Sequence, residues 1–450
     1  MKKTMGLVCL LLSLWLNAEA QSMTDKLDEL MQAYTKNKEF SGSVLIAKQG
    51  IILLEKGYGL KNIKEQSMND SHTIFPIASV TKTFTSTLIL KLAEMNKLSL
   101  QDKLSKYYPD YPHGDSITIE NLLMHTSGIY NYTQNNDFMF SKATKPANEA
   151  IMLGLFKDKP LDFVPGTGWR YSNSGYSLLG YIIEKVTKMR YDQAMRYYIF
   201  KPLQMNQSGF DFAHLNLTKR AIGYYSDSGK EYIKEAPMVD SSVHSAAGAI
   251  YSTVGDLYQW HKGLQSYQIL SKPFLEKATT PFKNNYGYGW IIDSMDHKKI
   301  VSHSGGLWGF RSNFARVVED DICIILFSNI ETPGLEHVTK KLLTVLYEKP
   351  YQLPIKKQAI KLSEEALNAY VGTYEIEEQK LIIEIKIEQG NLVSYPENGP
   401  RSEMLALSDG HFFLSEEEEF EVKFEKDNTG KVSKLVLNFS GKVREGKKIN

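Results

Sequence analysis

The stretch "IASVTKTF", residues 77–84, decides how the rest of the sequence is interpreted. Ser79 and Lys82 stand three positions apart at the start of a predicted helix over residues 79–96. By chance alone, a chain of this length contains on the order of one or two S-x-x-K matches. This chain contains a single one. The spacing alone therefore leaves two readings of Ser79, an ordinary helix cap or a nucleophile with its base.

A serine and a lysine at this spacing can carry acyl-transfer chemistry. A serine hydroxyl is a weak nucleophile at neutral pH, and it needs a neighbouring base and hydrogen-bond donors for the oxyanion formed when it attacks a carbonyl. On a helix the residue three positions later lies over the same face, so the Lys82 amine can reach the Ser79 hydroxyl. The positive end of the helix dipole also favours negative charge at that place. The catalytic reading needs partners elsewhere in the chain.

Two further motifs supply those partners. "WRYSNSGY" places Tyr171-Ser172-Asn173 in a loop just before a predicted helix, and "VSHSGGLWGF" places His303-Ser304-Gly305-Gly306 at the end of a predicted strand. The order S-x-x-K, Y-x-N, H-x-G resembles the penicillin-recognising serine hydrolases, in the branch that holds class C β-lactamases, D,D-carboxypeptidases, D-aminopeptidases and related esterases. The resemblance covers residues 23–349 and implies an α+β fold of the β-lactamase/transpeptidase type, an antiparallel sheet flanked by helices plus an all-helical region.

The resemblance also implies a role for each motif residue. Ser79 would be the nucleophile, and Lys82 and Tyr171 would share the general base and acid duties. Asn173 would orient the substrate amide and the lysine, and the backbone N–H groups of Ser79 and Gly306 would form the oxyanion hole. Free tyrosine and lysine both titrate near pH 10. We expect Lys82 to ease the ionisation of Tyr171.

The strand motif bears on the substrate. His303, Gly305 and Gly306 would line the substrate-binding strand. The β-lactamases of the family usually carry lysine at the position of His303, where a fixed positive charge helps to hold a substrate carboxylate, whereas histidine is mostly neutral near pH 7. Arg311 is a candidate for supplying that charge, and its alternative is an ordinary surface position on a strand. Carboxylate recognition therefore stays open.

Taken together, the motifs predict a serine hydrolase that forms an acyl-enzyme on Ser79 and cleaves a peptide, amide or ester bond without a cofactor; the N-terminal sequence, residues 1–20, predicts that it is exported. One alternative is a D,D-carboxypeptidase or β-lactamase that acts on cell-wall peptides or β-lactams, and another is a catalytically silent binding module. The ten histidines show no HExxH motif or close pairing, so we expect no metal site. His125 in "MHTSG" is expected to be a structural, hydrogen-bonding histidine.

The composition and the N-terminal sequence indicate which partners and which location to expect. The formal net charge is +1, which favours a small-molecule or short peptide substrate and indicates neither nucleic acid nor an anionic membrane as partner. Two lysines, an apolar run over residues 7–16 and the sequence Ala18-Glu19-Ala20 predict a signal peptide over residues 1–20. The apolar run is too short to span a membrane, and no later segment is long enough. We expect a periplasmic or secreted protein without a membrane span in the mature chain.

Hydrophobic patterning predicts the domain organisation. Two β-rich runs near the N-terminus and four more over residues 286–329 predict one sheet completed by both ends of the hydrolase domain, which we place at residues 21–352. A linker over residues 353–362 leads to period-two runs over residues 363–450, which predict a small antiparallel β-barrel-like domain. That domain resembles the lipocalin-like domain appended to some family members. Cys323, in the apolar run "DICIILFSN", is expected to be a buried core residue.

Overall fold

The computed structural model describes residues 22–226, 233–332, 334–355, 357–377, 381–397, 401–415, 417–439 and 442–449. The predicted signal peptide lies outside the described residues. The chain divides into two compact units, Met1–Leu353 and Pro354–Asn450, which we describe one at a time.

The first unit is built on a six-stranded antiparallel sheet in the order β2-β1-β12-β11-β10-β9. Its strands are β1 (Gly42–Lys48), β2 (Ile51–Tyr58), β9 (Ile291–Met295), β10 (Lys298–Leu307), β11 (Phe310–Val317) and β12 (Ile322–Ser328). Strand β1 pairs with β12 from Gly42 opposite Ser328 to Lys48 opposite Ile322. The prediction that both ends of the domain complete one sheet is therefore confirmed.

One predicted strand starts later than expected. The sequence "YGYGWII" predicts a strand from Tyr286, but β9 begins only at Ile291. Gly289 has φ +76°, which interrupts an extended strand, and its missing Cβ makes room for the carbonyl oxygen of Lys82. This segment is therefore a close-packed connection that runs past the first catalytic motif.

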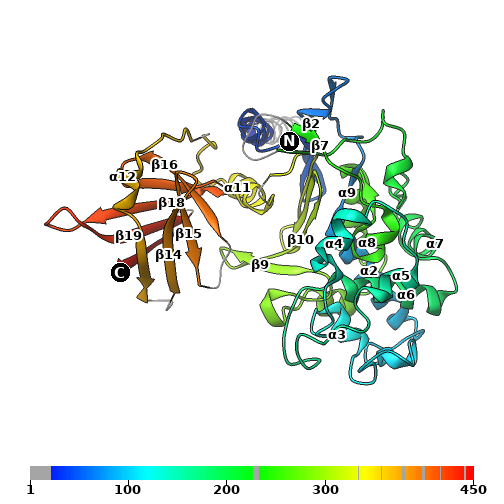
Figure 1. Cartoon of the computed structure of the whole chain (residues 1–450). Coiled ribbons are helices and arrows are strands. Elements are labelled where there is room, and N and C mark those ends of the chain that lie inside the picture. Colours follow the sequence, from blue (N-terminus) through cyan, green and yellow to red (C-terminus); the bar gives the residue numbers. More distant parts are fainter. Residues whose placement is uncertain are drawn as a thin grey trace, which may run out of the picture. The chain divides into compact units, whose positions relative to one another are not determined.

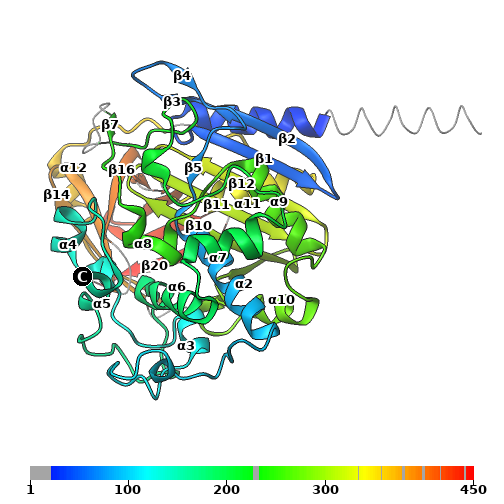
Figure 2. The same cartoon turned by 90° about the vertical axis from the view of Figure 1, so that its right-hand side faces the viewer.

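Alternating side chains of the sheet pack into two separate cores, one on each face of the sheet. Leu45 and Ala47 of β1 join a core with Phe84 and Trp260, which come from the helices α2 (Thr81–Glu94) and α9 (Val254–Gln265). The intervening Val44 and Ile46 join the opposite core, which is covered by a helix over residues 22–36 and by α11 (Glu336–Leu346). Figures 1 and 2 show α2, α8 and α9 on one side of the sheet and α11 on the other. The period of two in the strand sequences thus produces a helix–sheet–helix arrangement.

Helix α2 runs through the middle of this unit. Every residue from Thr81 to Leu90 is buried, so the helix has no solvent face over most of its length. The other helices are α3 (Ile119–Leu123), α4 (Asn136–Ser141), α5 (Glu149–Gly154), α6 (Asn173–Thr187), α7 (Tyr191–Met195), α8 (Ser241–Gly248) and α10 (Lys272–Ala278). Short strand pairs join β3 (Leu60–Asn62) to β4 (Ser67–Met68), β5 (Phe75–Pro76) to β8 (Tyr251–Ser252) and β6 (Tyr224–Ser226) to β7 (Ile233–Glu235).

The second unit is a closed antiparallel barrel, which confirms the predicted fold class of this region (Figure 1). After α12 (Glu364–Asn368) it comprises β13 (Gly372–Ile376), β14 (Leu381–Glu388), β15 (Asn391–Pro396), β16 (Ser402–Ser408), β17 (His411–Leu414), β18 (Glu417–Lys426), β19 (Val432–Phe439) and β20 (Lys442–Lys448). Strand β13 pairs with both β14 and β20, which closes the barrel. Packed side chains that include Tyr374, Phe412, Phe424 and Leu435 form its core.

Two further expectations concern single features. Cys323 lies on β12 and is fully buried, so it is a core residue, and burial raises the pKa of its thiol. Among the residues that the structure describes, no helix is long and apolar enough to cross a membrane.

Candidate active site

Ser79 lies in the 3-10 turn Ala78–Val80, directly before α2. The residue before it, Ala78, has φ 47°, a left-handed conformation that costs a non-glycine residue about 1–2 kcal/mol. The turn is held on both sides, because the Ile77 amide donates to the carbonyl of Ile250 at 2.9 Å and the Ser312 hydroxyl donates to the carbonyl of Ile77 at 2.7 Å. The surrounding elements thus fix a strained turn that presents the Ser79 hydroxyl.

The Lys82 amine reaches back to that hydroxyl, as the S-x-x-K spacing predicts. Its Nζ lies 3.0 Å from Ser79 Oγ, 2.8 Å from Asn173 Oδ1 and 2.7 Å from the carbonyl oxygen of Ala247. All three partners are uncharged, and the lysine is fully buried. Burial without an anionic partner holds the pKa of Lys82 well below its ordinary value.

Tyr171 approaches the same hydroxyl from the loop before α6. Its phenol donates to Ser79 Oγ at 3.0 Å, and the Lys82 Nζ lies 4.9 Å from the centre of its ring. Burial raises the pKa of Tyr171, and the hydrogen bond with Ser79 opposes this in part. Desolvation of the phenolate therefore has the larger effect on Tyr171, and the expectation that Lys82 eases ionisation of this phenol stays a prediction. Tyr171 is a neutral phenol at pH 7.

His125 supports the tyrosine loop from behind, in keeping with its predicted structural role. Its Nδ1 accepts the Ser172 N–H at 3.2 Å, and its ring centre lies 4.3 Å from that of Tyr171. Burial, followed by the nearby Lys82 and His303, holds its pKa well below the ordinary value. A neutral imidazole can therefore accept the backbone N–H that positions the Y-x-N loop.

His303 lies on β10 and, like Lys82 and Tyr171, is not among the residues that line the cavity. Its side chain is buried at 2% exposure, with Nδ1 2.6 Å from the carbonyl oxygen of Ser304 and Nε2 3.0 Å from Tyr286 Oη. Burial, with a smaller contribution from Lys82, lowers its pKa to about 3. The neutral ring agrees with the expectation that this histidine carries no fixed charge, and its role in substrate binding stays a prediction.

Gly305 and Gly306, which follow on the same strand, differ in how closely other atoms approach them. A Cβ on Gly305 would lie 2.4 Å from the carbonyl oxygen of Ile77 and 3.0 Å from the Ala78 Cβ, so only glycine lets β10 approach the turn that carries Ser79. Gly306 meets nothing closer than 3.5 Å and lines the pocket. Strand β10 and the Ser79 turn are thus in direct contact.

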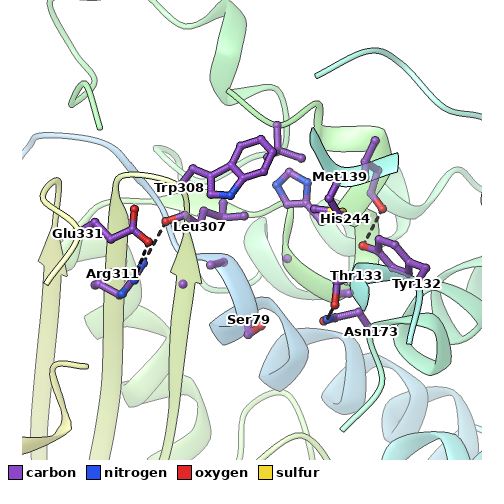
Figure 3. A pocket seen from close by; sticks show the side chains of 16 residues that line it. Ser79, Tyr132, Thr133, Met139, Asn173, His244, Leu307, Trp308, Arg311 and Glu331 are labelled. Carbon is purple, nitrogen blue, oxygen red and sulfur yellow. Dashed lines mark hydrogen bonds and ion pairs between the residues drawn. The ribbon is translucent and has the colours of Figure 1, made fainter. Parts of the chain in front are cut away.

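A cavity of about 380 Å³ opens above Ser79 (Figure 3). Asn173 and Thr133 lie on one side of Ser79, and Arg311 and Glu331 lie on the other. The remaining lining residues are Ala78, Tyr132, Met139, Val239, Val243, His244, Ala247, Gly248, Gly306, Leu307 and Trp308. The cavity has the size and mixed polar and apolar lining of a site for a small substrate.

Several of these lining residues are not predicted from the sequence. His244 follows Asp240 in a run of small residues, and burial and Lys82 lower its pKa to about 4. Trp308 stacks on Phe140 with ring centres 6.0 Å apart, and Glu331 pairs with Arg311. No local pattern marks these positions, because tertiary packing alone brings them to Ser79. Within the described part of the chain, no group of three or more His, Cys, Asp or Glu side chains could hold a metal ion.

Two segments of the chain match known protein families. Residues 26–348 match the family described as Beta-lactamase. The chain belongs to the beta-lactamase family. Residues 356–448 match a domain of unknown function, DUF3471.

Individual relatives and solved structures are similar to this chain over most of its length. A penicillin-binding protein of Bacillus subtilis strain 168 is 29% identical over 422 residues, which are 88% of this chain and 92% of that protein. The structure of an octameric penicillin-binding protein homologue from Pyrococcus abyssi superimposes with a TM-score of 0.66 at 26% identity and covers 94% of this chain and 99% of its own. A D-amino acid amidase from Ochrobactrum anthropi SV3 shares the fold, with a TM-score of 0.63 at 20% identity over 74% of this chain and 99% of its own. The chain is a serine hydrolase of the β-lactamase fold, related to penicillin-binding proteins.

Proposed function

We propose that this protein is an exported hydrolase that forms an acyl-enzyme on Ser79 and cleaves an ester, amide or peptide bond of a small molecule or short peptide. One observation carries the proposal: Ser79 Oγ is hydrogen bonded at 3.0 Å by both Lys82 Nζ and Tyr171 Oη, at the base of a cavity. Two proton-carrying groups on one serine hydroxyl are what nucleophile activation and leaving-group protonation require.

The acylation step follows from the protonation states. The lowered pKa of Lys82 favours its neutral amine, whose lone pair takes the proton of Ser79 while the oxygen attacks the substrate carbonyl. The backbone N–H groups of Ser79 and Gly306 stabilise the oxyanion. When the intermediate collapses, the neutral phenol of Tyr171 gives its proton to the leaving oxygen or nitrogen, and the proton on Lys82 restores the phenol. The acyl group is then bonded to Ser79 Oγ.

Deacylation uses the same groups with water in place of the serine. Lys82, again neutral, accepts a proton from a water molecule directly or through Tyr171, and the hydroxide attacks the ester carbonyl. Collapse releases the carboxylic acid product and returns a proton to Ser79 Oγ. Asn173, whose Oδ1 accepts from Lys82 at 2.8 Å, holds the amine toward the serine in both steps.

The proposal is tested with a Ser79→Ala variant and a nitrophenyl ester. We expect turnover to fall to the background rate while the fold stays intact, because the acylated oxygen is missing. Ser116→Ala, at an exposed serine, is the matched control and should keep wild-type turnover. Full activity in Ser79→Ala would refute the assignment, and failure of the wild type to react with a fluorophosphonate probe would instead favour a binding module.

A second candidate is a D,D-carboxypeptidase or β-lactamase, which is supported by the relatives that are named as penicillin-binding proteins. Incubation with a labelled penicillin followed by intact mass measurement separates the two candidates. A stable adduct or turnover of the penicillin, either one lost in Ser79→Ala, would support the D,D-carboxypeptidase or β-lactamase candidate, and hydrolysis of esters with neither would support an esterase or aminopeptidase.

Export is part of the same proposal and rests on the sequence of residues 1–20 alone. The expected mature N-terminus is Gln21. N-terminal sequencing of protein from the periplasm or medium of the expressing cell should begin there, and recovery of uncleaved chain in the cytoplasm would contradict export.

A further inference from the structure

Arg311 lines the cavity that opens above Ser79. In the pairing of β10 with β11, Arg311 is directly opposite Gly306, whose N–H is the proposed oxyanion donor. A Cβ placed on Gly306 would lie 3.5 Å from Arg311 Nη1. A carbonyl held at Gly306 would therefore have the guanidinium of Arg311 as a neighbour.

This guanidinium is already engaged by the protein. Its Nη2 pairs with Glu331 Oε1 at 2.8 Å, its Nε donates to the carbonyl oxygen of Thr332 at 3.1 Å, and its Nη1 donates to the carbonyl oxygens of Leu307 at 3.1 Å and Phe310 at 3.0 Å. The contacts occupy all three nitrogens, and the Glu331 carboxylate cancels the charge. The Arg311 side chain is 24% exposed and the Glu331 side chain 34% exposed, so the pair is partly open to solvent.

The other basic groups near Ser79 do not take the place of Arg311 as a cation for a substrate carboxylate. Lys82 is buried against three protein acceptors, and His303 is buried and neutral. His244 lines the cavity, but its pKa is lowered to about 4, so it is also neutral at pH 7. Among the lining residues that the structure describes, Arg311 is the one fixed cation, and it shares its wall of the cavity with the carboxylate of Glu331.

We propose that Glu331 is a specificity-determining residue that neutralises Arg311 and thereby selects substrates with no carboxylate beside the scissile bond. Uncharged esters and amides are then preferred, because a substrate carboxylate finds no unpaired cation and is repelled by Glu331. This inference rests on the proposed acyl-enzyme function and specifies its substrate class.

The test compares two aryl esters of one acyl group, with 3-carboxyphenyl and 3-(methoxycarbonyl)phenyl leaving groups, which differ in charge at one position. The wild-type full chain should give the higher kcat/KM with the uncharged ester. Glu331→Gln keeps the size of the side chain and frees the charge of Arg311. The ratio of anionic to uncharged kcat/KM should then rise about tenfold, the effect of one charge-assisted contact, and this gain should fall with added salt.

Two further variants separate a specificity role from a structural one. Asp293→Asn removes one negative charge from β9, where Asp293 pairs with Lys340, and should leave the ratio unchanged. Adding Arg311→Gln to Glu331→Gln should return the ratio to the wild-type value.

Each outcome decides between the possibilities. An unchanged ratio in Glu331→Gln, or a wild type that prefers the anionic ester, overturns this inference while leaving the acyl-enzyme proposal standing. Turnover of neither ester by the wild type overturns both.

Discussion

At the scale of single residues, the chemistry depends on a lysine buried without a counter-charge. A lysine that pairs with a carboxylate stays protonated at neutral pH, whereas Lys82 has Ser79, Asn173 and a backbone carbonyl as its partners. Desolvation is the cause of its lowered pKa, so the free base is reached well below the ordinary pKa of a lysine. The burial of α2 is thus what converts this side chain into a base.

Lys82→Arg tests this directly. Arginine carries a positive charge and does not give up a proton in proteins, so we expect kcat/KM for an uncharged ester to fall by about 10²–10⁴-fold, the usual contribution of a general base. Lys91→Arg, on the same helix, is the control and should change little, because Lys91 forms an ion pair with Glu94 that arginine can also form. In the wild type, the acid limb of the pH profile should lie well below the ordinary lysine pKa, and an acid limb near pH 10 would contradict a base of this kind.

Part of this site was predictable from the sequence and part was not. Ser79, Lys82, Tyr171 and Asn173 come together as the motifs imply, because helix geometry fixes the first pair and the start of α6 fixes the second. The burial of His303 was not predictable, since it depends on tertiary contacts such as that with Tyr286. The same holds for the Arg311 and Glu331 pair.

At the scale of elements, the site depends on how closely β10 approaches the turn before α2. The hydrophobic alternation that predicts these strands arises from two cores on opposite faces of the sheet, which is why β1, β10, β11 and β12 were found from the sequence. The late start of β9 was not predictable from the sequence, because the aromatic and glycine pattern of "YGYGW" is shared by strands and by packed connections. The distance between two elements, such as β10 and the turn before α2, likewise cannot be predicted from the hydrophobic pattern along the chain.

Two neighbouring glycines test that spacing. In Gly305→Ala the new Cβ would lie 2.4 Å from the Ile77 carbonyl oxygen, so β10 or the Ser79 turn must shift. We expect a loss of about 1–3 kcal/mol of unfolding free energy, as for other overpacked sites, and at least a tenfold loss of kcat/KM for the uncharged ester. Gly306→Ala, with 3.5 Å of room, should cost clearly less in both measurements. Equal effects in urea unfolding and kinetics would show that the close approach is not what Gly305 permits.

At the scale of the whole molecule, the first unit buries several neutral histidines. Burial lowers the pKa of His261 and His303 to about 3 and that of His244 to about 4, and it holds that of His125 well below the ordinary value. In the unfolded chain each ring takes a proton near pH 6.5. Below that pH the unfolded state therefore binds more protons than the folded state, and the free energy of unfolding must fall as the pH falls from about 6.5 toward 4.

Each such histidine contributes at most about 1.4 kcal/mol per pH unit to that slope. His303→Gln should remove up to this amount between pH 6 and pH 5, because glutamine can hydrogen bond without taking a proton, whereas His72→Gln, at an exposed position, should leave the slope unchanged. Tryptophan fluorescence in urea measures it selectively, since Trp169, Trp260, Trp290 and Trp308 all lie in the first unit and the barrel sequence has none. A wild-type unfolding free energy that stays constant or rises from pH 6.5 to pH 5 would mean that the buried rings are protonated in the fold, and Lys82 would then share its pocket with added positive charge.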